Sequence, residues 1–480
     1  MSVARDSVYN LAGAVAPAIF MLAVTPFYLG AIGPERFGVL AICWTIVAAL
    51  QFASLGMGPA LTYRLAIRDD RPVAERSAIV WTALAIALLA SLVGAVLVVG
   101  AAEIYFKYFF HAEAGLNGEI RQALPLLGGL LPLAVVIGVL NGALQGRRRF
   151  GTLNFIAIVR SGLLAVVPLA VAWLIGVGLK GLVLATVAAS ALVAVWEFAI
   201  CTTAVPLQMP LLPRAADVRA LVGYGAWMSA TSLIAPLVLV LDRFVIGAVR
   251  GPAAVAIYVL PYYLVQQLVL IPASLTSAVL PRYAPLSTEE DVQRLQSSSL
   301  TWLNGLLTPL SIVAIAFAAP FFSLWIGPTL GRVAGPVAAI LLVGGWVHGI
   351  GHIPSTLLAG RSRPQVVTKL LLICLIPYVG ALYWATFHFG VMGAAAVWTL
   401  RAAFDPLLFI STRPRPSDLW RVALSAVLVL CAMASALTLA WTSAGYWVVM
   451  TLIITAACYQ NRTILVSSVG EFRKLAFSAA

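Results

Sequence analysis

The chain has 480 residues, of which 62% are hydrophobic and only 10% are charged, and its mean hydropathy is +1.01. A soluble globular protein carries roughly a quarter charged residues, so these values exclude an ordinary water-soluble fold. The net charge of +13 is typical of some nucleic acid-binding proteins. Here the basic residues lie in short segments between apolar stretches, as in membrane proteins, and we expect no nucleic acid partner.

Apolar stretches of about 20 residues recur along the whole chain, and an α-helix of this length crosses the hydrocarbon core of a bilayer. Transmembrane β-strands would alternate polar and apolar residues over about ten positions, and these stretches do not alternate. The sequence therefore predicts an all-α polytopic membrane protein with about fourteen transmembrane helices. The predicted spans are 8–30, 37–60, 77–101, 121–143, 152–175, 181–203, 220–246, 253–280, 297–320, 334–358, 366–387, 390–411, 419–441 and 444–460.

The segments between these spans alternate between strongly and weakly basic. Cytoplasmic loops of membrane proteins carry an excess of lysine and arginine, so the alternation predicts that both termini lie in the cytoplasm. An even number of spans agrees with that orientation. The strongly basic segments and the tail contain Arg64, Arg68, Arg71, Arg76, Arg147–Arg149, Arg214, Arg219, Arg282, Arg294, Arg361, Arg363, Arg413, Arg415, Arg421, Arg462, Arg473 and Lys474.

Four loop landmarks recur in the same order at a nearly constant offset of 212 to 218 positions. Single matches of this kind are common, but their order and spacing indicate an internal repeat. The landmarks and their copies are Gly33-Pro34 and Gly251-Pro252, Arg64 and Arg282, Gly146–Arg149 and Gly360–Arg363, and Gly178–Gly181 and Gly390–Gly393.

The repeated unit contains six predicted spans, so its two copies run in the same sense through the membrane. Such parallel repeats are a known transporter arrangement, related by an axis along the membrane normal. We expect an N-terminal six-helix half at 1–219 and a C-terminal six-helix half at 220–412, arranged around a central cavity. Residues 413–480 would form two extra transmembrane helices and a cytoplasmic tail.

Ionisable residues within membrane spans are costly and are therefore candidate functional residues. Arg401 and Asp405 stand four positions apart and can neutralise each other on one helix face. Asp242 and Arg243 can be residues near the interface that extend toward the headgroups. For the charges without a local partner, a cavity or an interhelical pair is favoured. The candidates are Arg160, Glu197, Asp242, Arg243, Arg401 and Asp405.

His348 and His352 share a helix face in the pattern His-Gly-Ile-Gly-His, but no glutamate follows the first histidine and no acidic third ligand is near. This differs from the zinc-protease motif, so we expect packing or cavity lining, with a proton-sensitive role as the alternative. The five cysteines all fall inside apolar runs, which indicates neither a disulfide framework nor a metal site. We expect no cofactor.

Several motifs resemble those of the polysaccharide repeat-unit flippases, the polysaccharide-transport branch of the MOP superfamily, which also contains MATE exporters and lipid II flippases. They are Pro-Phe-Tyr-Leu-Gly-Ala-Ile-Gly-Pro-Glu-Arg-Phe-Gly at 26–38, Leu-Gly-Met-Gly-Pro-Ala-Leu at 55–61 with Arg64, Leu-Asp-Arg-Phe-Val-Ile-Gly at 241–247, and Ala-Gly-Arg-Ser-Arg at 359–363. One departure is Ser54, where many relatives have an acidic residue.

The resemblance implies a flippase that moves undecaprenyl-pyrophosphate-linked oligosaccharide repeat units across the bacterial inner membrane. Its product would serve O-antigen, capsule or exopolysaccharide synthesis, by alternating access driven by H⁺, Na⁺ or the substrate gradient. Under this reading the substrate-binding residues are Arg64, Arg160, Arg243 and Arg401, because guanidinium groups pair with pyrophosphate or acidic sugars. The ion-coupling candidates are Glu197, Asp242 and Asp405. We expect a monomer in contact with membrane lipids, near a polymerase of the same pathway.

Two other classes of protein remain as alternatives. A MATE-like cation-coupled exporter of small molecules would share the two halves, but it prefers an acidic cavity and usually has twelve spans. A membrane polysaccharide polymerase or glycosyltransferase would need a large outer loop or a soluble domain for its catalytic groups, and the predicted loops are short. We therefore expect that the protein is not an enzyme.

Overall fold

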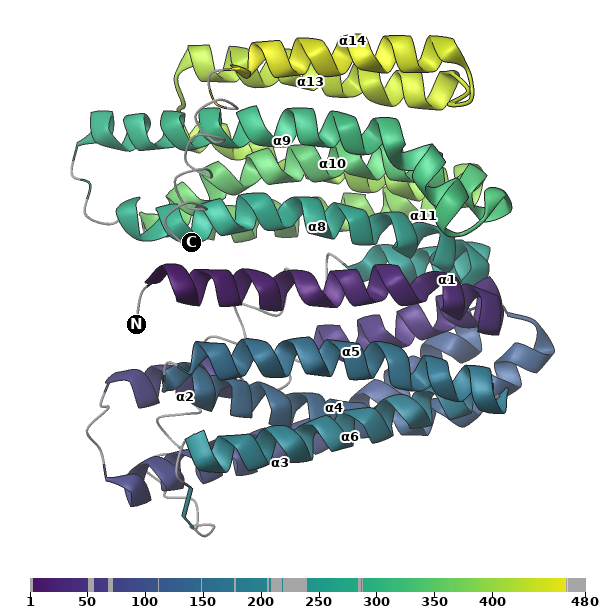
Figure 1. Cartoon of the computed structure of the whole chain (residues 1–480), viewed down its shortest axis with the longest axis vertical. Helices are drawn as coiled ribbons and strands as arrows, with labels where there is room; N and C mark the ends of the chain where they lie inside the picture. The colour runs from purple at the N-terminus through teal and green to yellow at the C-terminus, as the bar shows by residue number, and fades with distance from the viewer. Residues whose placement is uncertain are drawn as a thin grey trace. The chain divides into compact units, whose positions relative to one another are not determined.

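The computed structural model describes residues 3–50, 56–67, 72–110, 112–147, 149–176, 178–204, 207–208, 218, 240–283, 286, 288–361, 363, 365–462 and 464. Within these ranges the regular structure is entirely helical (Figure 1). The predicted seventh span, 220–246, lies mostly outside the described residues, and its last part belongs to a helical segment at 240–250. The helices are α1 (Val3–Leu50), α2 (Met57–Ile67), α3 (Val73–Ile104), η2 (Tyr105–Phe109), α4 (Ala114–Gly146), α5 (Phe150–Ile175), α6 (Leu179–Ala204), α8 (Pro252–Tyr283), α9 (Glu289–Trp325), α10 (Pro328–Gly360), α11 (Gln365–Ala402), η3 (Asp405–Leu408), α12 (Phe409–Thr412), α13 (Pro416–Thr438) and α14 (Ala444–Gln460).

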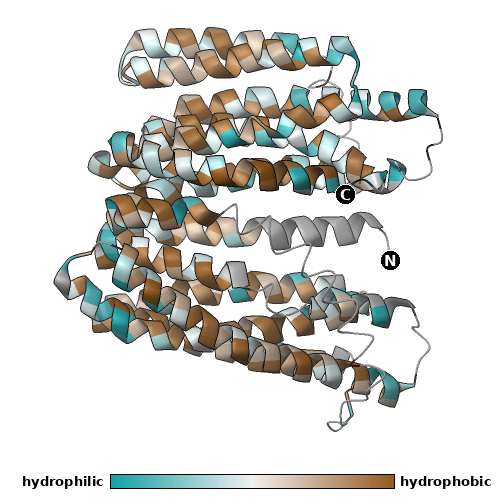
Figure 2. Ribbon diagram, turned by 180° about the vertical axis from the view of Figure 1, so that it is seen from behind, coloured by the Kyte–Doolittle hydropathy of each residue, from teal (hydrophilic) through white to brown (hydrophobic). Residues whose placement is uncertain are grey.

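The described part of the chain contains ten helices that are long and apolar enough to cross a membrane. Hydrophobic residues recur along these helices (Figure 2), and many of their side chains are exposed. On α3, for example, the side chains of Leu89, Val93 and Val96 are between 64% and 74% exposed. In water such a surface would aggregate, whereas in hydrocarbon it meets a matching solvent. The protein is a multi-pass membrane protein.

The helices group into two compact units, an N-terminal unit (Met1–Ala256) and a C-terminal unit (Ile257–Ala480). In the N-terminal unit, α4 packs against α2, α3 and α6, and α1 packs against α5. In the C-terminal unit, α10 packs against α9 and α11, and α13 packs against α9 and α14. The unit boundary falls within the first turns of α8.

Two of the long helices are sharply kinked at a glycine. Gly33 in α1 has φ 77° and ψ 167°, and Gly390 in α11 has φ 62° and ψ −143°. These conformations are open to glycine and unfavourable for other residues. The kink in α1 separates predicted spans 8–30 and 37–60, and the kink in α11 separates predicted spans 366–387 and 390–411. A single long helix thus contains two predicted spans in each case.

The recurring loop landmarks have matching local geometry in the two units. After α4, the backbone N–H groups of Arg147 and Arg149 donate to the carbonyls four and five residues before them, and those of Arg361 and Arg363 do the same after α10. The bonds run Arg147 to Ala143, Arg149 to Leu144, Arg361 to Leu357, and Arg363 to Leu358. Each loop is therefore closed by the same pair of backbone hydrogen bonds.

The glycines of these loops also make equivalent helix contacts. A Cβ atom at Gly146 would lie 2.8 Å from the Cβ of Leu65, and one at Gly360 would lie 2.8 Å from the Cβ of Tyr283. Leu65 and Tyr283 are themselves 218 positions apart, each one residue after the repeated arginine. Gly33 and Gly251 likewise share φ values of 77° and 79° before a proline. These matches agree with the predicted repeat.

The segment at 102–120, between the third and fourth predicted spans, is mostly helical. α3 continues to Ile104 and is extended by one π-helical turn, Tyr105–Phe109, and α4 begins at Ala114. The Tyr105 hydroxyl donates to the Phe244 carbonyl at 2.8 Å. Phe106 and Phe110 are buried, while Tyr108 and Phe109 are exposed. Tyr108 and Phe109 are therefore free to contact the membrane, whereas Phe106 and Phe110 pack inside the N-terminal unit.

Candidate functional site

A buried ion pair joins the middle of two adjacent helices in the N-terminal unit. Nη1 of Arg160 on α5 lies 3.9 Å from Oε2 of Glu197 on α6. The Glu197 side chain is completely buried, whereas that of Arg160 is 26% exposed. Neither Glu197 carboxylate oxygen has a hydrogen-bond partner among the described residues. The interhelical pair expected from the sequence thus forms, with the arginine as its accessible member.

Arg160 faces a cavity of about 390 Å³ within the N-terminal unit. Polar groups on its wall come from α4, α5 and α6, and Trp44 contributes an aromatic ring from α1. Most of the remaining wall is apolar. The lining residues are Pro17, Met21, Trp44, Val47, Leu130, Ala134, Ile137, Gly138, Asn141, Arg160, Ser161, Leu164, Ala165, Thr186 and Ser190. A concave site with a few converging polar groups is the usual form of a ligand-binding site.

Asp242 and Arg243 form a second buried charged site in the N-terminal unit, in the helical segment 240–250. The Arg243 backbone N–H donates to Oδ1 of Asp242 at 2.8 Å. The Arg243 guanidinium donates through Nη1 to the Thr45 hydroxyl on α1 at 2.6 Å. Both residues are less than one-tenth exposed, so their side chains do not extend out from the surface of the unit. The bond from Arg243 to Thr45 ties the start of this segment to α1.

Three charged or titratable side chains meet in the C-terminal unit. Nη2 of Arg401 on α11 lies 3.7 Å from Oδ2 of Asp405, which begins the 3₁₀ turn η3. Nδ1 of His348 on α10 lies 2.5 Å from the same oxygen. The His348 and His352 rings are edge to face, with centroids 5.0 Å apart. The pair expected from the four-residue spacing is present, and a histidine joins it.

Gly351 explains why Asp405 can reach His348. A Cβ atom at position 351 would lie 2.5 Å from the Cβ of Asp405, too close for any other residue to be accommodated without movement. Two turns nearer the start of α10, Gly344 leaves room for Trp398 and Thr399 of α11. The Gly-rich pattern around His348 therefore lets α10 approach both the end of α11 and η3. This signal was present in the sequence as His-Gly-Ile-Gly-His.

Arg64 stands apart from these groups. It lies in the last turn of α2, is half-buried, and does not line the cavity that contains Arg160. One ion pair that the sequence did not indicate joins Arg36 of α1 to Glu119 of α4. Nε and Nη2 of Arg36 donate to the two carboxylate oxygens at 2.9 and 2.6 Å. Glu119 also accepts the Leu179 backbone N–H, so it connects α1, α4 and α6.

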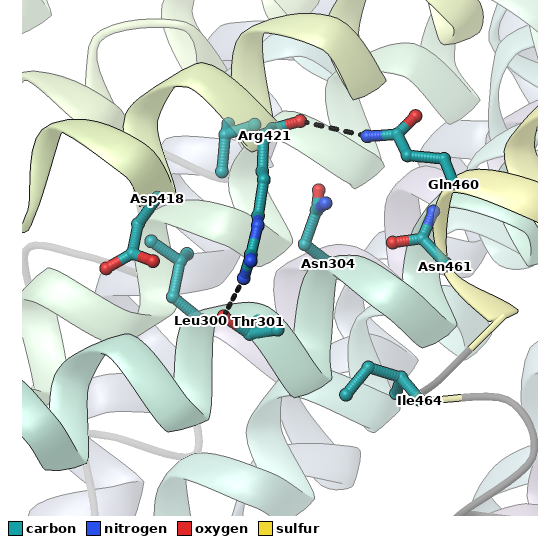
Figure 3. Close-up of a pocket in the computed structure, with 9 residues that line it drawn as sticks. Leu300, Thr301, Asn304, Asp418, Arg421, Gln460, Asn461 and Ile464 are labelled. Carbon is teal, nitrogen blue, oxygen red and sulfur yellow. Dashed lines mark hydrogen bonds between the residues drawn. The ribbon is translucent and has the colours of Figure 1, made fainter.

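A small polar pocket of about 110 Å³ lies between α9, α13 and α14 (Figure 3). The Arg421 side chain extends toward Thr301, and the Gln460 amide donates to the Arg421 carbonyl at 3.2 Å. Gln460 also donates to the Ser425 hydroxyl at 3.0 Å, and the Asn304 amide does the same at 2.9 Å. Polar contacts between helices hold membrane proteins together where no hydrophobic effect acts. The hydrogen bonds around this pocket therefore hold α13 and α14 against α9.

The described residues contain no group of three or more histidine, cysteine, aspartate or glutamate side chains that could hold a metal ion. Cys43 and Cys201 are buried in the N-terminal unit. The polar groups at the sites described above are charge pairs, hydroxyls and amides.

The fold is that of transporters of the MOP superfamily. A solved structure titled "Lipid II flippase MurJ, inward closed conformation" aligns with a TM-score of 0.71 at 13% identity, covering 98% of this chain and 99% of that one. A multidrug resistance MATE family transporter of the MOP superfamily, in its inward-facing conformation, aligns with a TM-score of 0.64 at 16% identity. That match covers 88% of this chain and 96% of the other.

The family described as polysaccharide biosynthesis protein matches residues 31–330, more than half of the chain. The chain belongs to this family. A Shigella flexneri protein named "Putative O-antigen transporter" is 25% identical over 413 residues, covering 85% of this chain and 97% of that protein. The resemblance drawn from the motifs at 26–38, 55–61, 241–247 and 359–363 is confirmed.

Proposed function

We propose that the protein is a flippase that moves a lipid-linked oligosaccharide across the membrane. The observation that carries this proposal is the cavity of about 390 Å³ in the N-terminal unit, with the Arg160 guanidinium on its wall. The family membership supports a role in polysaccharide synthesis. The printed names of an O-antigen transporter and a lipid II flippase among its relatives in sequence and fold agree with a lipid-linked substrate.

The cavity has the chemistry that such a substrate needs. A guanidinium forms paired hydrogen bonds with phosphate or carboxylate oxygens, and Arg160 would bind the pyrophosphate or an acidic sugar. Asn141, Ser161 and Ser190 offer amide and hydroxyl groups to sugar hydroxyls, and Trp44 offers a flat apolar face. The lipid chain would stay in the bilayer. In the full substrate path, Arg64, Arg243 and Arg401 would supply further positive charge.

We place the protein in the inner membrane of a bacterium, with both termini in the cytoplasm. The support is the excess of arginine in alternate loops, including the equivalent loops at Arg147–Arg149 and Arg361–Arg363. The substrate would be undecaprenyl-pyrophosphate-linked and would move from the cytoplasmic to the periplasmic leaflet. Its sugars would then enter O-antigen, capsule or exopolysaccharide, through a polymerase near a monomeric flippase.

The mechanism would be alternating access between two repeated halves, 1–219 and 220–412, with 413–480 added to them. The matching geometry of the Gly146 and Gly360 loops supports the repeat. Movement would be coupled to H⁺ or Na⁺. The candidate carboxylates are Glu197 and Asp242, which are fully buried, and Asp405, whose side chain is 13% exposed. Among the described residues the cavity wall carries Arg160 and no acidic side chain, so a MATE-like acidic cavity for cationic compounds is disfavoured.

The proposal is tested by depleting the protein in cells that depend on it. We expect loss of surface polysaccharide together with accumulation of complete lipid-linked repeat units on the inner leaflet. Accumulation on the outer leaflet would instead indicate a polymerase, and unchanged polysaccharide would contradict the proposal. Complementation with Arg160→Ala should fail, whereas complementation with Arg332→Ala, which alters an exposed arginine at the start of α10, should succeed.

A further inference from the structure

One carboxylate oxygen in the C-terminal unit lies close to both an imidazole and a guanidinium. Oδ2 of Asp405 lies 2.5 Å from Nδ1 of His348 and 3.7 Å from Nη2 of Arg401. The guanidinium is charged at every physiological pH, whereas an imidazole gains or loses its charge near neutrality. The charge that Arg401 presents to its surroundings therefore depends on the protonation state of His348.

The distances show that Asp405 interacts more closely with His348 than with Arg401. A separation of 2.5 Å is a hydrogen bond, whereas 3.7 Å is an ion pair without one. Arg401 is 6% exposed, and its Nε and Nη2 atoms have no hydrogen-bond partner among the described residues. Donors of a buried charged group that lack an acceptor cost free energy, which an incoming anion would recover.

The remaining titratable groups near His348 are few. On α10 itself, His352 is in ring contact with His348. On α11, Cys374 lies within electrostatic range of both Arg401 and Asp405. α8 packs against this part of α10 through apolar residues, Val265 at Gly345 and Pro272 at Gly349.

The charged groups of the other two neighbouring helices are confined to their first turns. They are Glu289, Glu290, Asp291 and Arg294 on α9, and Asp418 and Arg421 on α13. Arg361, just after α10, pairs with Glu289 at 3.0 Å, which places the start of α9 beside the far end of α10. His348 lies more than three helical turns before that end, so these charges are remote from it.

We propose that His348 and Asp405 bind one proton that decides whether Arg401 is neutralised by Asp405 or available to an anion of the pyrophosphate type. With a neutral imidazole, the Asp405 carboxylate neutralises Arg401. When the imidazole gains a proton at Nε2, its positive charge neutralises the carboxylate through the bond from Nδ1, and Arg401 keeps its full charge. This inference rests on the proposed function, because it takes Arg401 as part of the anion-binding surface.

The two binding events are linked thermodynamically. Proton uptake by the pair tightens binding of the anion, and binding of the anion must draw a proton onto the pair by the same factor. The site would therefore load a proton together with a pyrophosphate group. It would make proton coupling a property of the C-terminal unit, with the histidine as the proton acceptor and the carboxylate as its counter-charge.

The test uses purified full-length protein in lipid nanodiscs and inorganic pyrophosphate as the probe. Its dissociation constant is measured at about pH 5.5 and about pH 8, on either side of the ordinary histidine pKa. For the wild-type protein we expect binding to be at least about fivefold tighter at the lower pH than in His348→Gln at that pH. At the higher pH the two proteins should bind alike.

Matched variants separate the proton site from other effects. His388 is an exposed histidine on α11, and His388→Gln should keep the wild-type pH dependence. Asp405→Asn should bind pyrophosphate tightly at both pH values, because nothing then neutralises Arg401. Because every variant meets the same probe, the ionisation of pyrophosphate itself cancels in the comparison, and thermal unfolding confirms that each variant is folded.

Equal pH dependence in the wild-type protein and in folded His348→Gln would overturn the inference, and so would absence of pyrophosphate binding by the wild-type protein at both pH values. Either result would leave the flippase proposal standing, because that proposal is judged by movement of the lipid-linked oligosaccharide. Conversely, failure to move that substrate with the pH-dependent binding intact would contradict the flippase alone.

Discussion

Arg160 and Glu197 pair across α5 and α6 at 3.9 Å, with the carboxylate fully buried and the guanidinium exposed to a cavity. The buried carboxylate pairs with the guanidinium, and Arg160 also lines the cavity, where a ligand can reach it. A charge at this depth is costly unless it is paired or used. Here Glu197 is the partner of Arg160, and binding of a ligand in the cavity is the use that we propose for it.

Replacing Arg160 should separate the two parts of its role. Arg160→Ala removes the donor and leaves Glu197 buried without its partner, and we expect transport to fall by about tenfold or more. Arg160→Lys keeps the charge but not the paired donors, so it should retain a measurable part of the activity. The measurement is surface polysaccharide at equal protein level in cells that depend on this protein. Undiminished polysaccharide in Arg160→Ala would remove this residue from the mechanism.

The kink in α1 gives a prediction about stability. Gly33 and Gly30 both have open space where a Cβ atom would lie, but only Gly33 has a positive φ, of 77°. Gly33→Ala should lower the free energy of unfolding by about 1–3 kcal/mol through backbone strain alone. Gly30→Ala, in regular helix, should be neutral or stabilising by up to about 1 kcal/mol. Thermal unfolding of the two variants side by side checks this, and equal stabilities would count against the kink.

The close approach of α10 to η3 gives a second prediction about packing. Gly351→Ala places a Cβ atom against that of Asp405, and we expect a loss of about 1–3 kcal/mol as the two segments separate. Gly380→Ala on α11 is the control, since a Cβ atom there meets nothing within 4 Å. The pH dependence of pyrophosphate binding should weaken in Gly351→Ala and persist in Gly380→Ala. A Gly351→Ala protein as stable as Gly380→Ala would show that the contact is not tight.

The orientation is tested by cysteine labelling in a variant from which the five native cysteines have been removed. Glu290→Cys, at the exposed start of α9, should react only with a reagent that enters the cytoplasm. Thr442→Cys, between α13 and α14, should react with a membrane-impermeant reagent added from outside. The reverse pattern would contradict cytoplasmic termini.

Local sequence patterns predicted much of the fold and some of the site. Apolar length revealed the spans, repeated Gly-Pro and Gly-Arg loops revealed equivalent turns, and the spacing of Arg401 and Asp405 revealed their pairing. Contacts between distant residues were not predictable. His348 meets Asp405 across 57 positions, and Arg36 meets Glu119 across 83. Both depend on how helices pack, and a single sequence does not contain that information.

The geometry of the kinked helices was likewise only partly predictable from the sequence. The short intervals between the predicted spans indicated where α1 and α11 change direction. They did not indicate the angle of each kink, which depends on the backbone conformation of Gly33 and Gly390. The same holds for the segment after α3, which lies between two predicted spans. It contains a π-helical turn, and Tyr105 in this turn donates to the Phe244 carbonyl, a contact between residues 139 positions apart.

The central claim is that this protein moves a lipid-linked oligosaccharide and that Arg160 binds it. The most direct measurement is the transfer of an undecaprenyl-pyrophosphate-linked oligosaccharide between leaflets of proteoliposomes that contain the purified full-length protein. We predict transfer by the wild-type protein and by Arg332→Ala, and transfer reduced by about tenfold or more in Arg160→Ala. Transfer no faster than in protein-free liposomes, or equal transfer by Arg160→Ala, would contradict the claim.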